Sequence, residues 1–523
     1  MPKVIVKFNA GYVQRNQVPY DDRIEQHPEQ YLGQNWTNLV RQFPGLTIER
    51  TVTSLTPQQL IDVVLDAKRK SAQHGRTYDR PDNHFHTFFA VRPPSGIDPM
   101  LVAAALRTWG GTIVDLAYVE GKIKLASWPT PGTTTENIAQ TQPYLRPAPV
   151  GIDAEYAWTI PGGDGGGNQN LDLRFADMEQ GWDLTHPELP SSRIQFIYGQ
   201  TGSPSDPNYN NVVNHGTSVL GIVLAVPNNV GCVGITPNVT TTFVTSCYPQ
   251  TPDEVGVTDV ATAIAAVIPS DNSKLRSGDV LLLEAQLLDT NAGLYVPLEV
   301  DSTLYEWIYS ATARDIVVIE PAGNAPGTDL DQYQDTYNGS GNTILNRGSP
   351  QFRSPDSLAI MVGAASSGIP HTPTPGCNFG SRVDCYGWGD RVGTTLAKGG
   401  YGTLSDTSAA AAIIAGAALS IQGIAQQGQK GDLSNSNYRF SPWRLRSQLR
   451  NPATGTVSGN STWKSSLNST WDPVNNPDFS KWNADRIGVM PNLKSIIMAI
   501  LPPPPPPPNT GTAPAAPTGL RVS

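Results

Sequence analysis

Ser408 is the residue whose position is most suggestive of chemistry. The segment Asp406-Thr-Ser408 is followed by an unbroken run of small and apolar residues through Leu419. This pattern predicts a buried helix with Ser408 at its N-terminus, where backbone N–H groups and the helix dipole favour an anion. Such a position suits a nucleophile whose attack creates an oxyanion, although a serine there often only caps the helix.

A histidine and an aspartate occur earlier in the chain in equally suggestive contexts. His215 is predicted to begin an apolar helix, and Asp177 to end a strand that starts at Leu171. Carboxyl ends of strands in open α/β sheets are where ligands bind. Taken alone, each has a structural interpretation: the histidine as a residue with its hydrogen bonds satisfied, and the aspartate as a turn former. Together with Ser408 they supply a nucleophile, a base that takes its proton and an acid that orients the base, the requirements of acyl transfer.

Four segments in chain order carry a resemblance to a known family. They are Asn214-His-Gly-Thr-Ser-Val-Leu-Gly-Ile, Val317-Val-Ile-Glu-Pro-Ala-Gly-Asn324, Asn378-Phe-Gly-Ser-Arg-Val-Asp384 and the Thr-Ser408 segment. With Asp177 before them, they resemble the subtilisin-like (S8) serine peptidases over roughly residues 150–425, with a closing segment at 486–493. The resemblance implies a catalytic triad of Asp177, His215 and Ser408, and implies that the Asn324 side chain donates to the oxyanion.

The sequence departs from the family pattern near the expected site. Asp406 stands where the family usually has glycine, and it is expected to crowd the substrate or to raise the pKa of His215. Glu284-Ala285-Gln286 stands where the family's substrate-binding strand reads S-x-G-G. We expect these three residues to bind substrate; Glu284 would favour a basic side chain before the cut, or would face away from the pocket. Glu179 is interpreted as a structural hydrogen-bond acceptor.

Four regions are predicted along the chain. Residues 1–126 form an N-terminal α+β unit whose strands and helices at 46–125 have the layout of a ferredoxin-like propeptide; this unit is an inhibitor and folding aid or a permanent accessory domain. Residues 127–150 are a Pro- and Thr-rich linker, and residues 151–500 the subtilisin-like domain, of the α/β class with a mainly parallel sheet between helices. Residues 501–523 are a proline-rich disordered tail, a spacer or a docking segment.

The charge and apolar composition of the chain limit the kinds of binding partner that we expect. The 523 residues contain 36 Lys and Arg against 45 Asp and Glu, a net charge of −9, with no long basic run. We therefore expect no nucleic-acid partner, and no membrane insertion because the longest apolar run, Ala409–Leu419, is too short. The four cysteines form no C-x-x-C pattern and are interpreted as buried thiols or one or two disulfides. No secretory signal is visible, which leaves an intracellular or an atypically exported protein.

The predicted function is hydrolysis of peptide bonds in protein or peptide substrates by a serine endopeptidase made as a zymogen. The predicted reaction requires no cofactor and no catalytic metal; the resemblance leaves structural calcium open. Two alternatives remain at this point: a catalytically impaired binding protein on the same fold, and an esterase that uses the same machinery.

Overall fold

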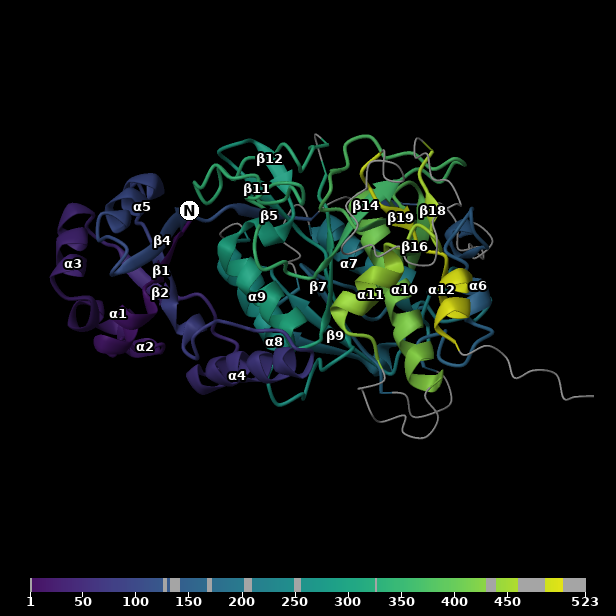
Figure 1. The fold of residues 1–523 in the computed structure, drawn as a ribbon, viewed down its shortest axis with the longest axis horizontal. Helices are drawn as coiled ribbons and strands as arrows, with labels where there is room; N and C mark the ends of the chain where they lie inside the picture. Colours follow the sequence, from purple (N-terminus) through teal and green to yellow (C-terminus); the bar gives the residue numbers. More distant parts are fainter. Residues whose placement is uncertain are drawn as a thin grey trace, which may run out of the picture.

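The computed structural model describes residues 2–125, 129–131, 142–166, 172–201, 209–248, 255–324, 327–428, 439–459 and 485–501. Figure 1 shows an N-terminal unit, purple to blue, beside a larger domain that contains the rest of the chain. The described residues of both units share one continuous hydrophobic core. The proline-rich tail from Pro502 on lies outside the described residues.

The N-terminal unit is a four-stranded antiparallel sheet covered by helices. Its strands lie in the order β2-β3-β1-β4, so that β1 (Val4–Phe8) pairs with both β3 and β4. The prediction placed this unit's elements at 46–125 only, but β1 is a central strand and three helices follow it. The other elements are α1 (Ala10–Arg15), α2 (Asp22–Gln26), α3 (Pro28–Gln42), β2 (Thr47–Arg50), α4 (Pro57–Gln73), β3 (Phe88–Arg92), α5 (Pro99–Arg107) and β4 (Val114–Val119).

The larger domain is built on a nine-stranded sheet, in the order β18-β19-β15-β14-β13-β10-β7-β9-β8. All neighbouring strands are parallel except β18 and β19. Buried, near-continuous apolar strands of this kind require cover on both faces. The strands are β7 (Arg174–Glu179), β8 (Ile194–Tyr198), β9 (Thr241–Ser246), β10 (Val280–Leu283), β13 (Val317–Pro321), β14 (Ile360–Ala365), β15 (Cys385–Trp388), β18 (Thr456–Val457) and β19 (Val489–Met490).

Helices supply that cover, which gives the predicted three-layer α/β arrangement. Helices α7 (Tyr209–Leu224) and α10 (Asp406–Gly428) pack together on one face, and α8 (Val257–Val267) packs with α9 (Ser302–Ala313) on the other. Helix α10 is long and apolar enough to cross a membrane, but its apolar window is entirely buried inside the protein. The remaining helices are α6 (Ala154–Ala157), α11 (Pro442–Leu449) and α12 (Leu493–Ile500).

Two small sheets tie the end of the N-terminal unit to the larger domain. Strand β5 (Lys122–Lys124) pairs with β11 (Gln286–Asp289), which also pairs with β12 (Leu294–Val296). Strand β6 (Thr130–Pro131) pairs with β17 (Gly400–Leu404), which follows β16 (Val392–Leu396). The chain that leaves the N-terminal unit is therefore anchored first at β11 and then at β17.

The predicted linker is shorter than 127–150. From Gln142 onward the chain packs into the larger domain: Tyr144 and Leu145 are buried, and the Gln142 amide donates to the Val233 carbonyl over 2.9 Å. These apolar side chains pack the segment into the core. The many prolines in the sequence had instead suggested a linker. All four cysteines are buried free thiols, one of the two predicted states.

The N-terminal unit packs against helices α8 and α9 of the larger domain. Glu120 accepts a hydrogen bond from the backbone N–H of Val257 at the start of α8, at 3.0 Å, where a carboxylate also complements the helix dipole. Phe85 stacks on Trp307 of α9 with ring centroids 3.9 Å apart. The contact between the N-terminal unit and the larger domain thus combines aromatic packing with the buried charged side chain of Glu120.

A buried ion pair joins helix α4 to the end of α9. Arg314 Nε donates to Asp66 Oδ2 over 2.7 Å, and both side chains are buried. The Arg314 guanidinium also donates to the Pro269 carbonyl over 2.9 Å. Removal of the carboxylate would leave a buried guanidinium without its counter-charge, which is more costly than the loss of an exposed pair.

We expect Asp66→Ala to lower the free energy of unfolding of the full chain by about 3 kcal/mol, because it leaves Arg314 buried and unpaired. Denaturant unfolding monitored by tryptophan fluorescence measures this. Asp62→Ala, one turn earlier on α4 and partly exposed, is the control and should change the free energy by less than about 0.5 kcal/mol. Equal effects of the two variants would contradict a structural role for the Asp66–Arg314 pair.

Candidate active site

Three neighbouring strands of the large sheet end at the site. Glu179 is the last residue of β7, Glu284 follows β10 directly, and Asn324 comes three residues after β13. The strands lie side by side in the order β13-β10-β7 and run parallel, so their carboxyl ends meet at one edge of the sheet. This is where open α/β sheets place functional groups.

His215 is brought to this edge by helix α7. It lies in the interior of α7, the seventh residue, and not at the start of a helix as the sequence predicted. The next residue, Gly216, lets the helix approach the loop after β7: a Cβ there would be 2.4 Å from the Gly181 carbonyl oxygen. Both ring nitrogens are engaged, Nδ1 with Glu179 Oε1 at 2.6 Å and Nε2 with Ser408 Oγ at 3.0 Å.

The carboxylate in contact with His215 is thus Glu179, and the prediction that Asp177 would hold the histidine is wrong in its geometry. Asp177 Oδ2 accepts a hydrogen bond of 2.8 Å from the Trp182 indole. The two acids are two residues apart on β7, so both point to the same face of the sheet. The strand continues to Glu179, two residues past the predicted end. The sequence has an acid at both of these positions on one face of the strand. This was the available signal that either acid could contact the histidine.

Ser408 lies where the sequence predicted, in the first turn of helix α10, and its side chain is buried. Asp406, two residues earlier, has a φ of 62°, in the left-handed region that favours glycine. The glycine usual in the family at this position therefore fits the local backbone. Burial raises the pKa of the Asp406 carboxyl. Its expected effects on substrate and on His215 remain predictions.

The Asn324 side chain is oriented by its amide oxygen. Oδ1 accepts hydrogen bonds from the Thr407 hydroxyl at 2.9 Å, the Thr407 backbone N–H at 3.2 Å and the Cys377 thiol at 3.3 Å. These three contacts fix the orientation of the Asn324 side-chain amide. Because Thr407 immediately precedes Ser408, these contacts tie Asn324 to the nucleophile's own segment.

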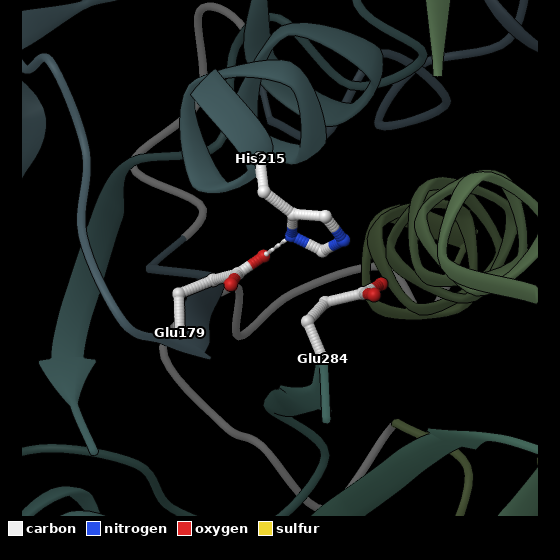
Figure 2. A group of neighbouring side chains, drawn as sticks. All are labelled: Glu179, His215 and Glu284. Atoms are coloured by element: carbon white, nitrogen blue, oxygen red, sulfur yellow. Dashed lines mark hydrogen bonds and ion pairs between the residues drawn. The ribbon is translucent and has the colours of Figure 1, made fainter. Parts of the chain in front are cut away.

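The three predicted substrate-binding residues have different surroundings. Figure 2 shows the Glu284 carboxyl below the imidazole that Glu179 contacts, with its oxygens toward the helix drawn in green. Ala285 is buried. Gln286 links two other parts of the site, since it accepts from the Asn324 backbone N–H at 2.8 Å and donates to the Leu125 carbonyl at 3.3 Å. Their role in substrate binding stays a prediction.

Burial dominates the electrostatics of the site. It lowers the pKa of His215 to about 4, so the imidazole is neutral and able to accept a proton over most of the pH range. Burial also raises the pKa of Glu179, and that of Asp177 is raised by burial and by the charge of Glu179. The 2.6 Å hydrogen bond between Glu179 and His215 therefore joins two groups whose charged forms are both disfavoured by burial.

Three of these side chains lie close enough together to be considered as metal ligands. Ligand atoms of Glu179, His215 and Glu284 lie within 4.8 Å of one another, a spacing that could accommodate a metal ion. However, both imidazole nitrogens already have hydrogen-bond partners, and a metal would have to break one of these bonds. One nitrogen with two carboxylates also differs from the all-oxygen ligand set that calcium prefers. We therefore assign no metal ligands here, and structural calcium elsewhere stays a prediction.

A sequence profile of the subtilase family of peptidases (S8) matches residues 178–465, just over half of the chain. The chain belongs to this family. The matched region begins at Met178, so that it contains Glu179, His215, Asn324 and Ser408 but not Asp177.

Two Bacillus proteins are among the relatives that the chain resembles. It is 23% identical over 266 residues to the alkaline elastase YaB of Bacillus sp. (strain YaB), a match that covers 50% of this chain and 56% of the elastase. It is 22% identical over 279 residues to the major intracellular serine protease of Bacillus subtilis (strain 168), 52% of this chain and 74% of that protein. The match thus spans little more than half of the elastase.

The geometry separates the roles of the two acids on β7. We expect Glu179→Gln to lower kcat about 10⁴-fold, because an amide cannot hold the Nδ1–H tautomer as a carboxylate does. Asp177→Asn is the matched control on the same face of the strand, and we expect a change of less than about tenfold because Asp177 makes no hydrogen bond to His215 and acts on it only through its charge. Steady-state hydrolysis of a peptide substrate measures both. A large loss in Asp177→Asn with little loss in Glu179→Gln would restore the original assignment.

Proposed function

We propose that this protein is a serine endopeptidase in which Ser408 is the nucleophile, His215 the general base and Glu179 the carboxylate that orients the base. The observation that carries the proposal is the pair of hydrogen bonds at His215, 2.6 Å to Glu179 and 3.0 Å to Ser408. A nucleophile, a base and an orienting acid within hydrogen-bond reach are the requirements for acylation of a serine. Substrates are peptides or proteins.

The proposed reaction follows from the order of these contacts. His215 Nε2 accepts the Ser408 hydroxyl proton as Oγ attacks the peptide carbonyl, and the same nitrogen then gives this proton to the departing amine. Glu179 keeps the other imidazole proton on Nδ1 and stabilises the transient imidazolium. Water hydrolyses the acyl-serine by the same route, so the reaction requires no cofactor.

The negative charge on the carbonyl oxygen would be received by two donors. One is the backbone N–H of Ser408 in the first turn of α10, where the helix dipole adds to the attraction. The other is the Asn324 side-chain amide, whose oxygen is held by Thr407 and Cys377. Pre-oriented donors of this kind need no rearrangement during the reaction.

We further propose that the N-terminal unit is a propeptide-like inhibitor of this site. Strand β5, at the end of that unit, occupies the edge of β11, and Gln286 connects Leu125 to Asn324. The side chains of Ser408 and His215 are fully buried in the intact chain. Both observations support a latent zymogen that is activated by cleavage between the unit and the larger domain.

The first test is reaction of the full chain with a fluorophosphonate, followed by intact-mass analysis and peptide mapping. We expect one adduct per chain, on Ser408, and only in molecules cut after the N-terminal unit. Ser408→Ala should abolish labelling while the circular dichroism spectrum is unchanged. No adduct on folded, processed protein would contradict the peptidase and favour a catalytically inactive binding protein. An adduct on the uncut chain would contradict only the inhibitory role.

Removal of the side-chain donor tests the oxyanion assignment separately. We expect Asn324→Ala to lower kcat by about 10²–10³-fold, with KM changed less than about threefold, because the lost hydrogen bond forms only in the transition state. Hydrolysis of a peptide and of an ester substrate by the processed enzyme measures this. An equal loss confined to KM would place Asn324 in substrate binding instead.

A further inference from the structure

Glu284 is a carboxylic acid in a place where no positively charged side chain balances it among the described residues except His215. Its side chain is fully buried, and within the part of the chain that the structure describes neither carboxyl oxygen has a hydrogen bond of good geometry. Its backbone N–H donates to the Met178 carbonyl over 3.1 Å. An ionised carboxylate in such surroundings would be strongly destabilised.

The neighbours of Glu284 are other acids and the reacting groups. Glu284 lies within 4.8 Å of ligand atoms on both Glu179 and His215, and the Ser408 hydroxyl is also close. Asp177, which lies on β7 with Glu179, adds a third buried carboxyl to the group. Among the described residues its Oδ1 has no hydrogen-bond partner. Cys247, a buried thiol after β9, faces the same acids. These neighbours come from β7, β9, α7 and α10.

This arrangement cannot hold three negative charges. The described charged groups that act on Asp177, Glu179 and Glu284 are one another and His215, and His215 offers at most one positive charge. Like charges that share a dry site raise one another's proton affinity. Accordingly, burial first, and then the charges of Glu179 and Asp177, raise the pKa of Glu284 well above its ordinary value.

We propose that Glu284 works as a neutral carboxylic acid in hydrogen-bond contact with the Ser408 side chain, and that its ionisation stops the reaction. The proposal rests on the serine peptidase function proposed above. A neutral carboxyl in this position is a hydrogen-bond donor, whereas its ionised form places a second negative charge beside the developing oxyanion. No bond to Glu284 is made or broken apart from this hydrogen bond.

The consequence is an enzyme that works best in acid. His215 must be neutral to act as a base, and its pKa of about 4 allows this well below neutral pH. Glu284 must be protonated, which fails as the pH rises through its raised pKa. The expected pH profile is therefore a bell displaced to the acid side of the one that an unperturbed histidine, with a pKa near 6.5, would give.

The experiment compares wild type, Glu284→Gln and Glu320→Gln across acidic to alkaline pH, on the protein as it is purified from the full chain, with its state of cleavage recorded by intact mass. The readouts are the rate of fluorophosphonate labelling at Ser408 and kcat/KM for a peptide. Glutamine keeps the shape and a donor but cannot ionise. Glu320 on β13 is the matched control, because it is equally buried and also has a raised pKa, but its described partners are Glu299 and Arg382 and none of the reacting groups.

We expect the wild-type labelling rate to fall at least about tenfold from its maximum at alkaline pH, and that of Glu284→Gln to stay within about twofold of its own maximum. Glu320→Gln should follow the wild type. A Glu284→Gln profile identical to that of wild type would overturn the proposal. So would a wild-type rate that stays high at alkaline pH, a result that needs no variant and therefore holds even if Glu284→Gln does not fold.

The proposal about Glu284 and the peptidase assignment fail in different ways. Labelling of Ser408 with no difference between the wild-type and Glu284→Gln profiles overturns only the role of Glu284. Absence of labelling at every pH in folded, processed protein overturns both. A loss of labelling in Glu284→Gln at all pH values, in a variant with an unchanged circular dichroism spectrum, shows that an ionised carboxylate is needed and overturns the neutral-acid role.

Discussion

The position of His215 between Glu179 and Ser408 is the constraint on which the rest of the site depends. A neutral imidazole can serve as a base only if one nitrogen is free of its proton and faces the nucleophile, and the partner at the other nitrogen decides this. Glu179 ends a strand, His215 lies inside a helix and Ser408 begins another helix. The sheet and the two helices on one of its faces must therefore be positioned accurately enough for both hydrogen bonds of His215 to form.

Burial gives these contacts their chemical character. The same desolvation that keeps His215 neutral in acid also destabilises every negative charge nearby, and three carboxyl groups lie in this one region. Family resemblance accounts for a single acid beside the histidine. The additional carboxyl of Glu284 is a property of this chain, and its location beside the nucleophile makes its protonation state part of the reaction that we propose.

The N-terminal unit contributes to the same arrangement from outside. It covers α8 and α9 with a sheet, joins them through buried charge pairs such as Asp66–Arg314, and extends β5 along β11 up to Gln286. The unit and the larger domain thus have one continuous hydrophobic core. These contacts are the ones on which the proposed inhibitory role of the N-terminal unit rests.

The sequence by itself determined the family, the α/β class, and the positions of His215 and Ser408, because their motifs consist of consecutive residues whose chemistry needs no partner to be recognised. It also indicated Asn324 through the strand and turn that precede it. Only the tertiary structure decided which acid contacts the histidine. Asp177 and Glu179 share one face of β7, and the choice between them depends on where α7 lies against that strand, which no local pattern encodes. The same holds for Glu284, whose surroundings are formed by β7, α7 and α10, segments 60 or more residues from it in sequence.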